Sequence, residues 1–179
     1  MNKFTVILPL VVACASAQEA CKPLPTFSLK ATNGKTYTQR DFSAMPTVVI
    51  FLKKGCPHNP KSAPDFNKLP AMLGKKVNVV AITDADLATA KAYAKEIKLN
   101  VPLIADAKLS VINAFGAKRS LDMAITCTHD KKVAQMWEGY SQESLKELVA
   151  SLPGHGGPSL DIKFEGFPTK KQSGCPFGM

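Results

Sequence analysis

The sequence predicts an α/β domain in which helices flank a mixed central sheet, with a β-hairpin at the start and an irregular C-terminal tail. Three short apolar runs rich in β-branched residues alternate with three segments of helical periodicity. In chain order these are 47–52, 57–73, 76–83, 84–98, 101–106 and 108–116. Alternation with short connections favours parallel strands. Two later runs, 123–128 and 132–139, surround a polar turn and predict an antiparallel pair, so the sheet is expected to be mixed.

The remaining elements follow from local signals. Residues 26–31 and 35–39 flank Asn33-Gly34, a strong hairpin turn signal. The continuous apolar run 47–52 is typical of a central strand that is buried on both faces. Residues 141–152 form an amphipathic pattern behind Ser141, which predicts a final helix with a serine cap.

Three residues set the expected helix boundaries. Pro57 is expected at the first helical position, where its missing N–H costs nothing. Pro70 is expected to kink or end that helix. Asp84 is expected to cap the helix in 84–98.

The first 17 residues have the pattern of a signal peptide. A short positive start precedes an apolar run, and Ala15-Ser16-Ala17 has the small residues of a signal-peptidase site. We therefore expect export to the periplasm or medium, with lipidation of Cys14 as the alternative. No other segment is apolar enough to span a membrane. The expected organisation is a signal peptide, a domain at 24–152 and a Gly/Pro-rich tail at 153–179.

Charge and cysteine content narrow the function classes. The net charge of +9 is spread along the chain without a basic block that includes aromatic residues, which argues against nucleic-acid binding. No cysteine pair has zinc-knuckle spacing, so neither a metal nor another cofactor is predicted. Four cysteines remain after cleavage at residue 17, and they can pair in three ways. They are Cys21, Cys56, Cys127 and Cys175.

Several stretches resemble the redoxin group of the thioredoxin-like superfamily, the alkyl hydroperoxide reductase and thiol-specific antioxidant (peroxiredoxin-like) family. The stretches are LPTFSLKATNGKTYTQRDF, PTVVIFLKKGCP, VPLIADAKLSVINAFGA and DKKVAQMWEGYSQESLKELVASL. The resemblance covers about residues 24 to 152 and implies a thioredoxin-like fold. It further implies a thiol-dependent oxidoreductase or peroxidase with a role in antioxidant defence and cell redox homeostasis.

The sequence departs from this family at four positions. Peroxiredoxins carry a threonine three residues before the reactive cysteine and a proline four residues further back, where this chain has Lys53 and Val49. Thioredoxins carry a second cysteine where this chain has Asn59. The cis-proline of thioredoxin-like proteins falls at Asp122. These departures weaken the case for peroxidase activity, because the threonine normally positions the peroxide.

Cys56 is the candidate nucleophile. It follows a buried strand and precedes a helix, close to Lys53, Lys54 and His58, and a helix N-terminus with nearby cations lowers the pKa of a thiol. His58 is a candidate to tune Cys56 or to shuttle a proton. The alternatives are that Cys56 is an inert half-cystine and that His58 is an ordinary surface residue.

Cys175 is the candidate resolving thiol, because it lies in the tail beside Gly174. A structural bridge between Cys175 and Cys21 is an equal alternative. The resemblance implies that Arg119 stabilises the thiolate or an anionic substrate. The alternative is that Arg119 is an ordinary surface residue. Cys127 lies in a predicted inner strand and is expected to be a small buried hydrophobe.

The sequence thus predicts an exported thiol–disulfide oxidoreductase in which Cys56 attacks and Cys175 or an external thiol resolves. The alternatives are a one-cysteine thiol peroxidase and a non-enzymatic binding module. The expected partners are protein or small-molecule thiols and disulfides, hydroperoxides in the second case, and a reductase that the sequence does not identify.

Overall fold

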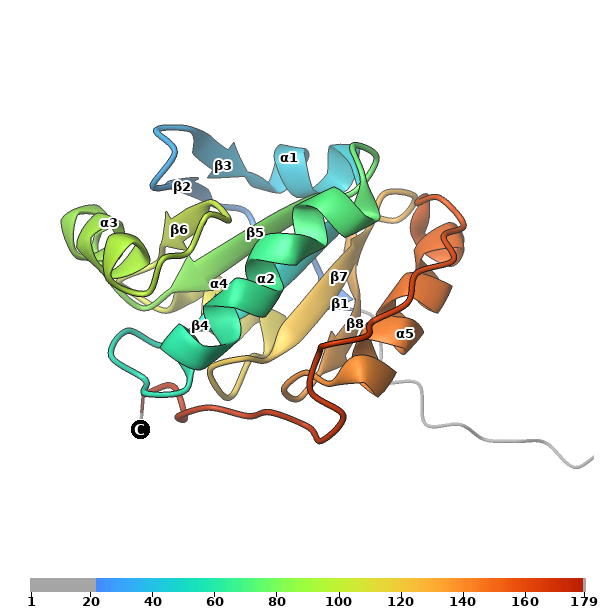
Figure 1. Ribbon diagram of the computed structural model, residues 1–179. Helices are drawn as coiled ribbons and strands as arrows, with labels where there is room; N and C mark the ends of the chain where they lie inside the picture. Colours follow the sequence, from blue (N-terminus) through green and yellow to red (C-terminus); the bar gives the residue numbers. More distant parts are fainter. Residues whose placement is uncertain (1–21, 179) are drawn as a thin grey trace, which may run out of the picture.

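A six-stranded sheet separates two layers of helices in this computed structural model, which describes residues 22–178 (Figure 1). The strands of the described residues are β1 Lys22–Pro23, β2 Ser28–Lys30, β3 Thr36–Thr38, β4 Thr47–Leu52, β5 Asn78–Thr83, β6 Leu103–Ala105, β7 Met123–Cys127 and β8 Lys132–Trp137. The helices are α1 Gln39–Ala44, α2 Asn59–Leu73, α3 Leu87–Glu96, α4 Ser110–Phe115 and α5 Gln142–Ser151, followed by the 3₁₀ turn η1 Leu152–His155.

The sheet is mixed, as the sequence predicts. Its strand order is β1-β8-β7-β4-β5-β6, with β4, β5 and β6 parallel to one another. The pairs β4–β7, β7–β8 and β1–β8 are antiparallel. The predicted N-terminal hairpin is present as β2 and β3, which form a separate two-stranded sheet. Its turn includes Gly34 at a φ of 84°, a conformation that favours glycine.

Strand β4 divides the core between the two layers. Val48, Ile50 and Leu52 point toward α2, α3 and α5, whereas Val49 and Phe51 point toward α1, α4 and the hairpin. All six residues of β4 are buried, which explains its uninterrupted apolar sequence. Such burial fixes the end of β4 in space, and the reactive loop begins there.

Helix α1 was not predicted. Thr38 and Asp41 form a capping box at its start, since the Asp41 carboxylate accepts from the Thr38 N–H at 2.9 Å. This Thr-x-x-Asp spacing is a recognisable start signal in the sequence. The predicted cap of α5 is confirmed, because the Ser141 hydroxyl accepts from the Ser144 N–H.

The expected start of α2 at Pro57 was wrong, and of the two effects expected for Pro70, the end of the helix does not occur. Helix α2 begins at Asn59 with Pro60 in its first turn, so Pro57 lies before the helix, and α2 runs past Pro70 to Leu73. A proline this close to the end removes few helical hydrogen bonds, and the Gly74 N–H still donates to the Pro70 carbonyl.

Helix α3 is capped by a different aspartate from the one expected. The Asp86 carboxylate accepts from the Thr89 N–H at 2.9 Å. Asp84 instead accepts from the Lys54 N–H at 2.7 Å, so it fixes the loop that follows β4. The expected cap therefore serves the reactive loop.

The tail after η1 lies against the rest of the molecule. It passes α5 and then crosses the edge of the fold beneath the start of α2 (Figure 1). Phe164, Phe167 and Phe177 are buried along this path. Among residues 22–178, no helix combines the length and apolar character needed to cross a membrane.

Candidate active site

Cys56 lies in a tight turn between β4 and α2. The Cys56 N–H donates to the Lys53 carbonyl, and the Asn59 N–H donates to the Cys56 carbonyl. Gly55 has a φ of 78°, a backbone conformation that few other residues adopt without strain. The sequence places the cysteine here because the buried strand ends at Leu52 and the helix begins seven residues later.

The C-terminal tail covers Cys56. Only 3% of the residue is exposed, and the Cys175 N–H donates to the Cys56 Sγ at 3.1 Å. On each side of this contact the tail is paired with Ser120, whose N–H donates to the Cys175 carbonyl at 2.9 Å and whose carbonyl accepts from the Gly174 N–H at 2.8 Å. Two cysteines 119 residues apart in the sequence therefore share one site.

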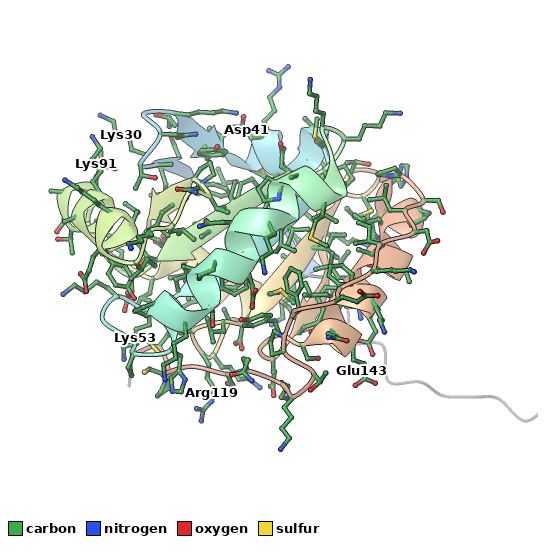
Figure 2. The ribbon with its side chains drawn as sticks, viewed as in Figure 1. Lys30, Asp41, Lys53, Lys91, Arg119 and Glu143 are labelled. Carbon is green, nitrogen blue, oxygen red and sulfur yellow. The ribbon has the colours of Figure 1, made fainter. Side chains whose placement is uncertain are left out.

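Two cationic side chains hold the tail from outside. The Lys53 Nζ donates to the Pro176 carbonyl at 2.7 Å, and the Arg119 guanidinium donates to the Gly174 carbonyl at 3.4 Å. Both side chains lie along the same edge of the molecule (Figure 2). The two cations therefore bind main-chain oxygens of the residues directly before and after Cys175.

Asn59 occupies the position at which a Cys-x-x-Cys pair has its second cysteine. It is fully buried, and its Nδ2 donates to the Lys53 carbonyl at 2.9 Å and to the Tyr93 hydroxyl at 2.8 Å. Its Oδ1 accepts from the Ser120 hydroxyl at 2.7 Å. Because the Ser120 hydroxyl also accepts from the Lys53 N–H, Asn59 ties the reactive loop to the segment that carries Ser120.

Asp122 organises the segment opposite Cys56. Its Oδ2 accepts from the N–H groups of Lys118 and Arg119, at 2.9 Å each, and its Oδ1 accepts from the Gly139 N–H at 3.0 Å. The intervening Leu121 has a φ of 74°. No peptide bond within residues 22–178 is cis, and the buried Asp122 carboxylate shapes the turn that precedes β7.

Hydrogen bonds place the negative charge on Cys56 rather than on Cys175. Burial raises the pKa of the Cys56 thiol, but hydrogen bonds from the Cys175 thiol, from the Cys175 N–H and from the His58 N–H outweigh it, so the pKa is lowered. The hydrogen bond to Cys56 raises the pKa of Cys175. Of the two thiols, Cys56 therefore loses its proton more readily than Cys175.

The four residues singled out from the sequence lie in one region. Cys56 and Cys175 are in contact, and Arg119 holds the tail through Gly174. His58 is the N-terminal cap residue of α2, and its side chain is exposed. The sequence did not predict the hydrogen bonds made at this site by Lys53, Asn59, Ser120, Asp122 and Gly174. Their partners lie up to 123 residues away, and one sequence carries no signal for contacts of that kind.

The other predicted features lie elsewhere. Cys127 is at the end of β7, and the antiparallel register with β4 puts it at the opposite end of the sheet from Cys56. Cys56, Cys127 and Cys175 all have free thiols. Cys14, Cys21 and the expected signal peptide lie outside the described residues, so the predicted Cys21–Cys175 alternative stays a prediction.

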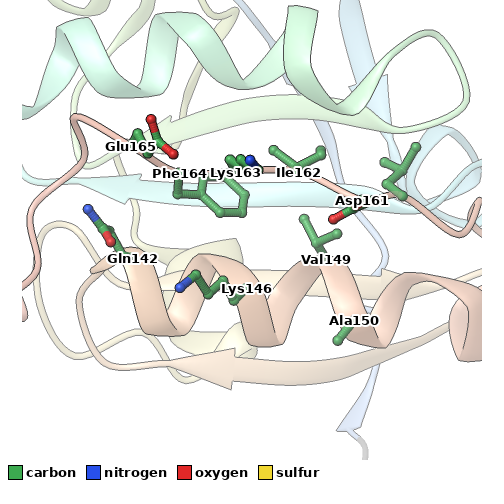
Figure 3. Close-up of a pocket in the computed structure, with 10 residues that line it drawn as sticks. Gln142, Lys146, Val149, Ala150, Asp161, Ile162, Lys163, Phe164 and Glu165 are labelled. Carbon is green, nitrogen blue, oxygen red and sulfur yellow. The ribbon is translucent and has the colours of Figure 1, made fainter.

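A pocket separate from the thiol lies between α5 and the segment 160–165 (Figure 3). Lys146, Val149, Phe164 and Glu165 contribute to its walls, and no cysteine lines it. Within residues 22–178, no group of three or more histidine, cysteine or acidic side chains is placed to hold a metal ion.

A model of the AhpC/TSA family matches residues 21–138. Peroxiredoxin Q of Xanthomonas campestris is similar in structure, with a TM-score of 0.61 and 18% identity over 75% of this chain and 96% of that one. An exposed lipoprotein thioredoxin of Streptococcus pneumoniae has a TM-score of 0.58 and 21% identity over 69% of this chain and 99% of that one. No curated protein matches the chain in sequence. Both structural likenesses establish a thioredoxin-like fold.

Proposed function

The chain belongs to the AhpC/TSA family, and we propose that it is an exported thiol–disulfide oxidoreductase in which Cys56 attacks and Cys175 resolves. The observation that carries this proposal is the 3.1 Å hydrogen bond from the Cys175 N–H to the Cys56 Sγ. It keeps the second thiol beside the first without a Cys-x-x-Cys pair. It also favours the thiolate, which is the attacking form.

The proposed reaction has two steps. The Cys56 thiolate attacks one sulfur of a substrate disulfide, a bond to that sulfur forms, and the other substrate sulfur leaves as a thiolate. Cys175 then loses its proton and attacks the Cys56 Sγ, which releases the first substrate sulfur and leaves a Cys56–Cys175 disulfide. Two electrons have passed to the substrate, and an external dithiol restores the reduced pair.

The other two site residues support these steps. The His58 N–H donates to the thiolate, and its exposed imidazole is the proposed carrier of the proton that Cys175 gives up. Arg119 positions the resolving cysteine because its guanidinium donates to the Gly174 carbonyl. Lys53 acts in the same way at the Pro176 carbonyl.

Peroxide reduction is the second candidate, because the family includes peroxidases and the Cys56 thiolate could attack a peroxide oxygen. That step would give a sulfenic acid and release water or an alcohol, and Cys175 would then form the same disulfide with loss of water. Lys53 has no hydroxyl at the position of the family's threonine, so slow turnover is expected. A third possibility, a non-enzymatic binding module, predicts that Cys56 reacts no faster than an ordinary thiol.

The test is a non-reducing mass map of the purified mature protein before and after one equivalent of a small disulfide. We expect a new Cys56–Cys175 crosslink, its loss in Cys56→Ser and Cys175→Ser, and no change in Cys127→Ser. A Cys175 that is bridged to Cys21 from the outset and stays so would contradict the resolving role. The same spectra give the N-terminus, where Gln18 supports cleavage after Ala17 and a lipidated Cys14 opposes it.

A further inference from the structure

The last seven described residues bind to the protein mainly through their main chain. We define the docking edge as residues 118–120 together with Tyr140. The Tyr140 N–H donates to the Gln172 carbonyl at 2.9 Å and the Gln172 N–H donates back at 2.7 Å, while the Phe177 N–H donates to the Lys118 carbonyl at 2.9 Å. With the two bonds of Ser120, these contacts follow the pattern of an added antiparallel strand.

Main-chain hydrogen bonds are available to any extended segment, so sequence preference must come from the side chains. At Gly174 a Cβ atom would lie 2.8 Å from the Ser120 Cβ, 2.9 Å from the Ser120 oxygen and 3.1 Å from the Cys56 Sγ. These contacts are too close for any residue except glycine unless the segment shifts. The position directly before the cysteine is therefore selective for glycine.

A second preference lies two residues after the cysteine. Phe177 is only 6% exposed and belongs to the apolar cluster that contains Val111, Phe115 and Ala117. A large apolar side chain at this place gains the free energy of burial in that cluster. The edge thus fits the pattern glycine, cysteine, any residue, large apolar residue.

We propose that the docking edge also binds an oxidised partner protein, through an extended segment in which glycine precedes a disulfide-bonded cysteine and a large apolar residue follows two places later. The tail would leave while this segment is bound. This inference rests on the proposed function and names its substrate class. It follows from the burial of Cys56 under the tail, since a protein disulfide cannot reach the Sγ until the tail moves.

The exchange couples product release to resolution. In the first step the partner's sulfur takes the place of Cys175, Cys56 attacks it, and the partner's other sulfur leaves as a thiolate that takes a proton from water. In the second step Cys175 loses its proton and attacks the Cys56 Sγ, so the partner's cysteine leaves as a thiol. The edge accommodates one strand, so the returning tail displaces the reduced segment.

The experiment uses the full-length Cys175→Ser variant, which retains the tail but cannot resolve. The probe is a synthetic peptide with the sequence of residues 172–178, its cysteine joined to thionitrobenzoate as a mixed disulfide. Attack by Cys56 releases coloured thionitrobenzoate. Two control peptides carry alanine in place of Gly174 or in place of Phe177. We expect the native peptide to react at least about tenfold faster than either control, as expected for contacts of more than a kcal/mol.

The second part of the experiment weakens the binding of the tail to the docking edge. A Phe177→Ala substitution in the Cys175→Ser background removes the apolar anchor of the tail, so the native peptide should react faster with this variant than with Cys175→Ser alone. Equal rates for the three peptides, or no gain on loosening the tail, would overturn the inference.

The proposed function can fail separately from this inference. A Cys175→Ser protein that does not react even with the symmetrical thionitrobenzoate disulfide would show that Cys56 is not a nucleophile, and both proposals would then fall. Reaction with that small disulfide but no discrimination among the peptides would remove only the docking edge. Double substitution Cys56→Ser and Cys175→Ser gives the background, because Cys127 alone remains among the described thiols.

Discussion

Cys56, in the loop after β4, and Cys127, the last residue of the neighbouring strand β7, are both buried and both free, yet their sulfurs have different hydrogen-bond partners. Cys56 is 3% exposed and Cys127 is 6% exposed. The Cys56 Sγ accepts hydrogen bonds, including that of the Cys175 N–H at 3.1 Å. The Cys127 thiol donates to the Asp130 carboxylate, and this bond is among those that lower the pKa of Asp130 against the opposing effect of burial.

The difference shows that burial alone does not decide whether a thiol is reactive. A sulfur that accepts hydrogen bonds is stabilised as a thiolate, whereas a thiol that donates to a carboxylate stabilises the charge of the carboxylate. The first arrangement favours nucleophilic attack, and the second is that of a structural cysteine. Four substitutions test this comparison, in order of decreasing effect.

The largest expected effect is the loss of exchange with a small disulfide in Cys56→Ser. A serine hydroxyl is not ionised near neutral pH, so the rate constant should fall by at least about 1,000-fold. Cys127→Ser should stay within about twofold of the parent protein, since that thiol lies at the opposite end of the sheet from Cys56. The rates follow from thionitrobenzoate release. A comparable loss in both variants would contradict the distinction between the two cysteines.

Asn59→Ala should cause the next largest change, in the free energy of unfolding. The substitution leaves the Lys53 carbonyl, the Tyr93 hydroxyl and the Ser120 hydroxyl short of a buried partner. We expect a loss of about 2–3 kcal/mol, measured by urea unfolding.

Asn67→Ala is the matched control for this loss. Asn67 also makes two hydrogen bonds, to Lys98 and Asn100, but at a more exposed place. Asn67→Ala should lower the free energy of unfolding by about 1 kcal/mol. If the two variants proved equally stable, Asn59 would not be the tie that holds the reactive loop.

Gly174→Ala should raise the pKa of Cys56, because it weakens a hydrogen bond that lowers this pKa. The added Cβ would push the tail away from Ser120 and Cys56, and the hydrogen bond from the Cys175 N–H would lengthen or break. The measurement is the pH at which alkylation of Cys56 reaches half its maximal rate. The midpoint is the diagnostic quantity, because a displaced tail also makes the sulfur more accessible and so changes the rate itself.

Gly154→Ala is the control for this shift. A Cβ at Gly154 meets nothing within 4 Å, and the residue is also in the C-terminal segment. Its midpoint should equal that of the parent protein. A Gly174→Ala midpoint that stays at the parent value would mean that the tail does not control the charge on Cys56.

Some features of the fold and the site could be predicted from the sequence, and others could not. The bounds of β4 were predicted to the residue, because a buried strand has a continuous apolar run with sharp ends. The position of Cys56 followed from that strand. Helix α1 was missed although Thr38 and Asp41 carry a capping signal. The contacts of Ser120 with Asn59 and with Gly174 could not be predicted, because they join segments at least 54 residues apart.

The sequence predicted only that the tail is long enough for Cys175 to reach Cys56. The length of the tail allowed the contact, but nothing in the sequence specified its hydrogen bonds. The contacts of Lys53 and Arg119 with the tail were not predicted for the same reason. Both were considered as cations near a thiolate, and each donates to a main-chain carbonyl of the tail. Cationic residues in a sequence do not reveal whether they bind an anion or a carbonyl.

The smallest expected effect is that of Asp130→Asn, which tests the environment of Cys127. The pKa of Asp130 is lowered in the folded protein, with burial opposing and the Cys127 thiol and Lys132 favouring the carboxylate. Its contribution to stability is therefore present above the unfolded pKa of about 3.9 and is lost as the pH falls through the folded value. Asp130→Asn should remove that part of the acid dependence and leave disulfide exchange at Cys56 unchanged. Urea midpoints at neutral and at acidic pH, with Glu138→Gln as an exposed control, measure the effect. A slower reaction of Cys56 in Asp130→Asn would show that the two ends of the sheet are coupled.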